Sequence, residues 1–138
     1  MLIHLKRNEK LYINGAVVRL DRRGTIQLLN DANFLMENHI MQPEEATTPL
    51  KQVYFLVQLM IMDPQNAHLM MELFKVNVAQ LRQITNNAEL SDAVETFEGK
   101  VLKGEYFESM KIIRQNFALE NQIAAGASPA GASSKVAA

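Results

Sequence analysis

Short apolar runs separated by turn residues dominate the first 41 residues of the chain. There are five such runs: 2–5, 11–13, 16–20, 25–29 and 34–36. Asn14-Gly15 stands between two of them and is a strong signal for a type I′ hairpin turn, because both of its residues must adopt positive φ. Asp21-Arg22-Arg23-Gly24 marks a second turn. Short strands at this spacing predict an antiparallel sheet or a small barrel.

Beyond residue 48 the apolar positions recur at helical spacing. Thr48-Pro49 and Asp63-Pro64 each place a capping side chain before a proline, a combination typical of the first turn of a helix. Residues 49–62 are apolar nearly all round, which indicates a helix buried on several sides. Three further stripes follow: Leu69, Leu73, Val76, Gln80 or Leu81, and Ile84; then Leu90, Val94, Phe97 and Val101; then Tyr106, Met110, Ile113, Phe117 and Ile123. Gly104 is expected to end the third helix.

These patterns predict an α+β fold, in which an N-terminal antiparallel β-sheet or small barrel precedes a C-terminal bundle of about four helices. The β layer covers residues 1–41, and the helical layer covers residues 49–123. The connector at 42–48 lies between them, and the prolines at 43 and 49 bias its backbone to extended geometry. At 124–138 the composition changes to mostly Ala, Gly and Ser, so this tail is expected to be disordered.

The composition narrows the class of protein. The chain has 138 residues, of which 48% are hydrophobic and 21% charged, and this balance predicts a globular protein. The absence of cysteine excludes a disulfide framework and a thiolate metal site. The N-terminus lacks the pattern of a signal peptide, and the longest apolar stretch, Val53–Met62, is about half of the ~20 residues that cross a bilayer. We therefore expect a cytoplasmic protein with no membrane partner.

No motif indicates catalysis. His4, His39 and His68 stand in three separate segments, and none has a second ligand three or four residues away. Glu44-Glu45 precedes a predicted helix N-terminus, where negative charge is favoured by the helix dipole, so we interpret this pair as structural. No phosphate-binding glycine motif surrounds the two turns. The sequence predicts neither an enzyme nor a site for a metal or another cofactor.

Positive charge is concentrated at the start of the chain. The net charge is −1 overall, but residues 1–30 hold six basic against two acidic residues, which leaves +4. The basic residues surround two predicted loops, the one after the strand at 2–5 and the one after the strand at 16–20: Lys6, Arg7, Lys10, Arg19, Arg22 and Arg23. In a small sheet these loops can lie close together, hold RNA phosphates and place Tyr12 for stacking on a base. A solvated strand edge that resists aggregation is the alternative.

The connector and its flanks resemble a known family. The segment 40–49, which reads Ile-Met-Gln-Pro-Glu-Glu-Ala-Thr-Thr-Pro, is similar to the signature connector of the FlbT family. Residues 13–18 and 21–23 resemble the family's early turn and basic turn, and residues 53–55 and 60–64 resemble the start of its helical part. Many members have Lys-Pro-Gly-Glu where this chain has Lys6-Arg7-Asn8-Glu9. The opening five residues with Arg7 also resemble the start of the CsrA family of RNA-binding regulators.

The FlbT resemblance implies a post-transcriptional regulator of flagellin synthesis and flagellum biogenesis. Such proteins act on the 5′ untranslated leader of flagellin mRNA, changing its stability or translation, and work alongside the small protein FlaF. Our first hypothesis is that the six basic residues and Tyr12 bind this RNA directly. The second is a protein-binding adaptor that acts through FlaF, flagellin or a nuclease without touching RNA. DNA is not an expected ligand, because the near-neutral chain carries no global positive field.

Overall fold

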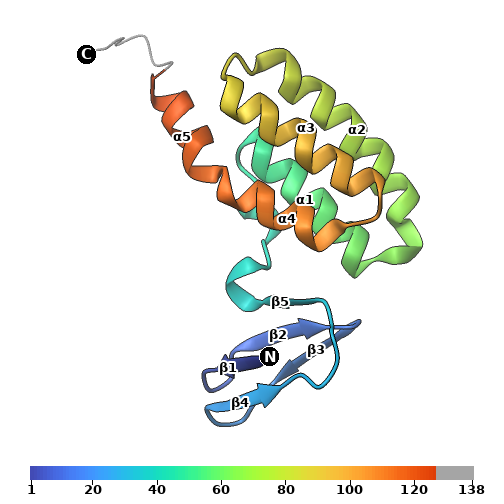
Figure 1. Cartoon of the computed structure of the whole chain (residues 1–138), viewed down its shortest axis with the longest axis vertical. Helices are drawn as coiled ribbons and strands as arrows, with labels where there is room; N and C mark the ends of the chain where they lie inside the picture. Colours follow the sequence, from blue (N-terminus) through green and yellow to red (C-terminus); the bar gives the residue numbers. More distant parts are fainter. Residues whose placement is uncertain (127–138) are drawn as a thin grey trace. The chain divides into compact units, whose positions relative to one another are not determined.

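The computed structural model describes residues 1–126 of the chain. The chain divides into two compact units. The strand unit is Met1–Met41, and the helical unit begins at Gln42. Figure 1 shows the strand unit in blue and the helical unit in green to red. The protein is therefore α+β, with its antiparallel strands before its helices, as the sequence predicts.

Five short strands build the strand unit as two small antiparallel sheets. The strands are β1 (Leu2–Leu5), β2 (Lys10–Ile13), β3 (Ala16–Arg19), β4 (Gly24–Gln27) and β5 (Phe34–Met36). One sheet pairs β1 with β4, and the other has the order β3-β2-β5. The hairpin between β2 and β3 turns at Asn14 and Gly15, whose φ values are 47° and 85°. These values confirm the predicted turn, because type I′ geometry needs positive φ at both central residues.

Both sheets contribute to one apolar core. Ile3 and Leu5 of β1 and Leu11 of β2 are buried at its centre. Partly buried side chains surround them: Ile13, Val18, Leu20, Ile26, Leu28, Phe34 and Met36. Alternate residues of a strand point to opposite faces, so each strand gives this core one face. On the other face of the three-stranded sheet, Tyr12 and Leu35 are also buried. The core fixes the strands from which the basic loops project.

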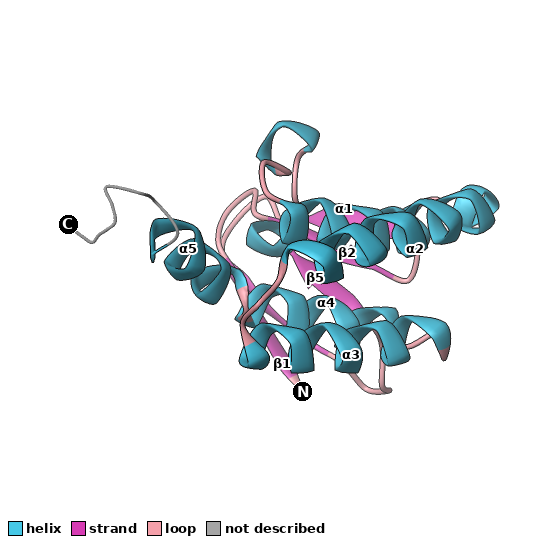
Figure 2. Ribbon diagram, turned by 90° about the horizontal axis from the view of Figure 1, so that it is seen from above, coloured by secondary structure: helices cyan, strands magenta, loops and turns pink. Residues whose placement is uncertain are grey.

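The helical unit contains five α-helices among the described residues. They are α1 (Pro49–Met62), α2 (Ala67–Ile84), α3 (Ala88–Leu102), α4 (Tyr106–Gln115) and α5 (Phe117–Gly126). Figure 2 shows α1 and α2 as one layer and α3 and α4 as the other. Helix α1 contributes six buried residues, more than any other helix: Leu50, Val53, Tyr54, Val57, Gln58 and Met60. It packs against α2, α4 and α5, which confirms the prediction of burial on several sides.

Several details differ from the sequence predictions. The connector, predicted to be extended, contains a short 3-10 helix at Pro43–Glu45. Helix α2 buries Phe74, Val78 and Leu81 in place of most of the predicted stripe.

The last predicted helix is divided at Asn116, which caps the C-terminus of α4 and donates its side-chain Nδ2 to the carbonyl of Ile112. Asp63-Pro64 begins a short 3-10 helix, Pro64–Asn66, and the α-helix starts only at Ala67. Helix α5 extends to Gly126, beyond the start predicted for the tail; the rest of that tail lies outside the described residues.

The start of α1 is capped from the far end of the unit. Thr48 Oγ1 accepts a hydrogen bond from the backbone N–H of Lys51 at 3.2 Å, as the sequence predicts. Glu120 of α5 accepts two more, from the Thr48 hydroxyl and, at 2.9 Å, from the backbone N–H of Leu50. The first N–H groups of a helix have no partner within the helix, and a carboxylate beside them is further stabilised by the helix dipole. Glu120 therefore joins α5 to the point where the connector ends.

A cluster of aromatic and cationic side chains joins α1 to α4 and α5. The rings of Tyr54 and Phe117 meet edge to face with their centroids 5.5 Å apart. Arg114 Nη1 donates a hydrogen bond of 3.0 Å to the Tyr54 hydroxyl. Burial raises the pKa of this hydroxyl, and the hydrogen bond and charge of Arg114 oppose that rise. Lys51 Nζ lies 5.8 Å from the centroid of the Phe117 ring, so α5 contacts the first turn of α1 through Phe117 as well as through Glu120.

The Glu120 cap leads to a test of stability. In the Glu120→Ala variant, the Thr48 hydroxyl and the Leu50 N–H lose their shared acceptor, so we expect the free energy of unfolding to fall by about 1–2 kcal/mol. Urea unfolding followed by circular dichroism measures the change. Glu95→Ala, at an exposed position on α3, is the matched control and should change the free energy by less than about 0.5 kcal/mol. Equal losses in the two variants would show that Glu120 does not act as a cap.

Candidate nucleic-acid interface

The six basic residues of the strand unit are all exposed. Lys6 and Arg7 stand in the turn between β1 and β2, and Lys10 begins β2. Arg19 ends β3, while Arg22 and Arg23 stand in the turn before β4. The side chains of all six are therefore accessible to solvent or to a ligand.

The turn between β1 and β2 has a defined geometry. The N–H of Glu9 donates to the carbonyl of Lys6 at 3.1 Å, and the φ of Asn8 is 63°. A positive φ at the third residue is the mark of a type II turn, which favours proline at the second position and glycine at the third. The Pro-Gly pair of many FlbT sequences fits this turn, and in this chain Arg7 and Asn8 take those two positions. Asparagine is among the few other residues that tolerate positive φ.

Backbone contacts bring the two basic loops together. The N–H of Asn8, in the first loop, donates to the carbonyl of Leu20, next to the second loop, at 2.9 Å. Lys10 and Arg19 are opposite each other in the β2–β3 ladder. Leu5 and Gly24 are opposite each other in the β1–β4 ladder, so the loops that follow Leu5 and precede Gly24 start side by side. Six cations thereby gather at the same two neighbouring loops.

A hollow lies between these loops. Its volume is about 860 Å³, and its lining residues are His4, Leu5, Lys6, Glu9, Arg23, Gly24 and Thr25. Lys6 and Arg23 supply its positive charge, one from each loop. His4 Nδ1 and Thr25 Oγ1 lie 3.0 Å apart across the β1–β4 pair. Sequence reasoning missed these two polar groups, because nothing in the sequence indicates that β1 pairs with β4.

Three carboxylates lie among the cations and are largely engaged by the backbone. Glu9 Oε1 accepts from the N–H of Lys6 at 2.9 Å, and Glu37 Oε1 accepts from the N–H of Lys10 at 2.6 Å. Asp21 is 3.9 Å from Arg22 Nε in a fully solvated ion pair. Exposed pairs of this kind contribute little energy and are easily exchanged for another anion. Six cations against three carboxylates leave a local charge of +3.

Tyr12 does not belong to this interface. It stands opposite Val17 and Leu35 in the three-stranded sheet, and only 8% of its surface is exposed. A ring this buried has no open face for a base, so the stacking role predicted for Tyr12 is corrected. Neighbouring residues of a strand point to opposite faces, so Tyr12 lies on the face opposite to that of the core residue Leu11. The sequence alone suggests that this second face is exposed to solvent.

A second hollow belongs to the helical unit. It has a volume of about 270 Å³ and is lined by Thr48, Pro49, Leu81, Ile84, Thr85, Leu90, Glu120, Asn121, Ile123 and Ala124. Apart from Glu120 and the few other polar groups, the lining is aliphatic. This groove suits an apolar side chain better than an ion.

The described residues contain no assembled metal site. Within residues 1–126, no three histidine, aspartate or glutamate side chains gather closely enough to hold a metal ion. His4, His39 and His68 stay in separate elements, on β1, in a short 3-10 helix and on α2. Across the same residues, no helix combines the length and the apolar character that crossing a membrane requires.

These features define a class: a small α+β protein whose strand unit carries a cationic pair of loops and whose helical unit carries an apolar groove. The chain belongs to the family of the flagellar protein FlbT, whose model matches residues 1–124. This result confirms the family resemblance carried by the connector and its flanking segments.

Relatives from several bacteria share most of the chain. A protein from Mesorhizobium japonicum is 41% identical over 124 residues, which cover 90% of this chain and 84% of the relative. A protein from Agrobacterium fabrum is 39% identical over 121 residues, 88% of this chain and 81% of the relative. One from Chelativorans is 38% identical over 121 residues, 88% and 83%. Each is named "Probable flagellum biosynthesis repressor protein FlbT". No solved structure matches the chain.

The turn that carries Arg7 offers a test. Replacing Asn8 by alanine places a Cβ-bearing residue with no local hydrogen-bonding side chain at positive φ, and we expect a loss of about 1 kcal/mol of unfolding free energy. Asn8→Gly removes that penalty and should leave the free energy unchanged or slightly higher. Asn38→Ala is the control, because Asn38 is also exposed but its φ is not positive. This variant should leave the free energy of unfolding unchanged. Thermal unfolding of the three variants ranks them; equal stability of Asn8→Ala and Asn8→Gly would contradict the turn geometry.

Proposed function

We propose that this chain regulates flagellum biosynthesis after transcription, by binding the 5′ untranslated leader of flagellin mRNA. The family and the names of its relatives support the regulatory role. The observation that carries the RNA ligand is the joining of the two basic loops by the Asn8–Leu20 backbone hydrogen bond. In this proposal the protein is not an enzyme; its effect on mRNA stability or translation follows from occupancy of the leader.

The chemistry of the interface suits phosphate more than base edges. Arginine presents a planar fork that holds phosphate oxygens through two parallel hydrogen bonds, and four of the six cations are arginines. The hollow between the loops has room for a sugar-phosphate group, with Lys6 and Arg23 on its walls. Residues 1–41 have no exposed Phe, Tyr or Trp, since Tyr12 is buried and Phe34 is partly buried. Selectivity would therefore come from the shape of the folded leader and the path of its backbone.

A protein-binding adaptor is the second candidate function. The aliphatic groove at α5 and the ends of α1 and α2 favours it, because such a groove accepts an apolar side chain of a partner. The effect on mRNA would then pass through FlaF, flagellin or a nuclease. A cytoplasmic location suits either function.

Charge reversal within the hollow tests direct RNA binding. We expect Lys6→Glu/Arg23→Glu to weaken binding of the flagellin leader by roughly tenfold or more, since each charge-assisted hydrogen bond to a phosphate contributes about 1.5 kcal/mol or more. The dependence of log affinity on log salt should also fall by ~0.7 for each phosphate that the variant no longer neutralises. Fluorescence anisotropy across a salt series measures both quantities, with an unrelated RNA of equal length beside the leader.

The control is Lys103→Glu/Lys111→Glu, which makes the same change of net charge at exposed positions of the helical unit. It should retain leader affinity within about twofold if the basic loops are the site. If both double variants weakened leader binding equally, the effect would come from net charge alone, and the hollow would not be the RNA site. Wild-type protein that binds neither RNA would favour the adaptor, and recovery of FlaF or flagellin on the immobilised protein would then be the expected result.

A further inference from the structure

Helix α2 carries two apolar faces, and only one of them is used within the chain. Phe74, Val78 and Leu81 are buried against the rest of the helical unit. The other face holds a row of exposed residues that we name the α2 stripe: Leu69, Leu73, Val76 and Ile84, with exposed fractions of 56%, 42%, 54% and 65%. The sequence pattern singles out this row, yet the structure buries the opposite face. Figure 1 shows α2 at an outer edge of the helical unit.

The α2 stripe has the form of a helix–helix contact. Its members follow one another at intervals of four, three and eight residues, and Gln80 fills the gap on the same side of the helix. At 1.5 Å per residue the stripe is ~22 Å long, which is the length of a contact between two helices of ordinary size. Single exposed apolar residues need no explanation, but four along one side of a helix mark an interaction surface.

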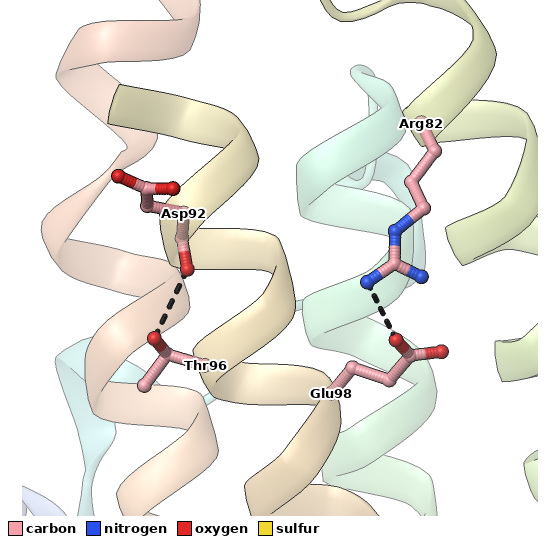
Figure 3. Close-up of polar contacts among 4 residues, drawn as sticks. All are labelled: Arg82, Asp92, Thr96 and Glu98. Atoms are coloured by element: carbon pink, nitrogen blue, oxygen red, sulfur yellow. Dashed lines mark hydrogen bonds and ion pairs between the residues drawn. The ribbon is translucent and has the colours of Figure 1, made fainter. Parts of the chain in front are cut away.

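We propose that the α2 stripe binds the α2 stripe of a second copy of this chain, with the two helices antiparallel. The charges beside the stripe support this choice. Helix α2 has three charged residues, and each has a partner within the chain: Glu72 and Lys75 are 3.8 Å apart, and Arg82 Nη2 lies 2.7 Å from Glu98 Oε1 of α3. Figure 3 shows the Arg82 guanidinium and the Glu98 carboxylate directed toward each other.

A surface whose flanking charges are paired internally is complementary to itself. In a two-fold dimer the same residues meet from both sides, so unpaired charge of one sign would face its own copy and repel it. The α2 stripe has no such excess, since its own members are aliphatic and Glu72 balances Lys75. A strongly acidic or basic partner helix would find no opposite charge to bind beside the stripe. The neutral stripe therefore fits a copy of itself better than a charged target.

The register follows from the position of the apolar residues. When the two-fold axis passes next to Val76, this residue meets Val76 of the second copy, and Leu73 lies near Gln80 of that copy. Leu69 then lies near Ile84 of the second copy. Ile84 also lines the aliphatic groove of about 270 Å³, so the N-terminal end of one α2 reaches the groove of the other copy. Antiparallel helices also bring opposite ends of their dipoles together.

Sedimentation velocity of the full chain tests the dimer. We expect wild-type protein to pass from monomer to dimer between about 1 µM and 100 µM, because self-association depends on concentration. Val76→Glu places two like charges at the two-fold axis and should raise the dissociation constant by at least about tenfold. Val17→Glu is the matched control, since Val17 of β3 is also an exposed valine, at 61%. Its dissociation constant should equal that of the wild type.

Two results of this experiment would overturn the proposal. One is wild-type protein that stays monomeric over the whole range, which would leave the stripe to a different protein. The other is equal weakening of the dimer by Val76→Glu and Val17→Glu, which would place the contact elsewhere. Circular dichroism spectra of both variants establish that the helices are intact, because both substitutions are at exposed positions and should not unfold the chain.

Engineered cysteines test the antiparallel arrangement, and the chain has no cysteine of its own to interfere. A disulfide needs Cα atoms within about 7 Å, so Val76→Cys should cross-link two copies under mild oxidation. Leu69→Cys should not cross-link with itself, but a mixture of Leu69→Cys and Ile84→Cys proteins should form the mixed dimer. Self-cross-linking of Leu69→Cys without the mixed product would indicate parallel helices and overturn this register.

Discussion

The burial of α1 on several sides is the constraint on which the helical unit depends. Only Pro49 and Gln52 of α1 are exposed, so this helix needs neighbours around most of its circumference. Helices α2 and α4 supply most of that cover, and α5 adds the ring of Phe117 against Tyr54. Burying side chains of this size stabilises a fold by about 1.5–3 kcal/mol each. No neighbour of α1 is dispensable, because removing one would return a strip of aliphatic surface to water.

Local chemistry made some elements predictable from the sequence. Asn14-Gly15 specifies its hairpin through backbone conformation alone, Thr48 caps α1 as expected, and Gly104 ends α3 with a φ of 78°. The bounds of α1 agree with the prediction, because Thr48 and Pro49 define its start. The buried face of α2 was not predictable, because its two apolar rows have equal helical periodicity and only the neighbouring helices decide between them. The break at Asn116 has no strong signal, since asparagine also occurs inside helices.

The composition of the candidate interface and the closeness of its two loops were predictable, but the contacts that join the loops were not. The basic residues and their two turns are visible in the sequence. The Asn8–Leu20 hydrogen bond and the His4–Thr25 contact join residues 12 and 21 positions apart and depend on how the strands pair. Tyr12 shows the opposite case, in which a residue of suitable chemistry is not accessible in the fold. Its position beside basic residues suggests a stacking group, and its burial depends on tertiary packing that no local pattern encodes. Charge can be counted along a chain, but exposure is a property of the fold.

The bond from Glu120 to the start of α1 links residues 70 positions apart and sets an order of events during synthesis. The strand unit is complete once residue 41 has left the ribosome, and its core draws on nothing translated later. Helix α1 emerges soon afterwards, but its first turn stays without the Glu120 acceptor until α5 has been made. The cap on α1 is therefore completed last, so a ribosome that stalls before α5 leaves a nascent chain whose first helix lacks the Glu120 acceptor and the Phe117 ring.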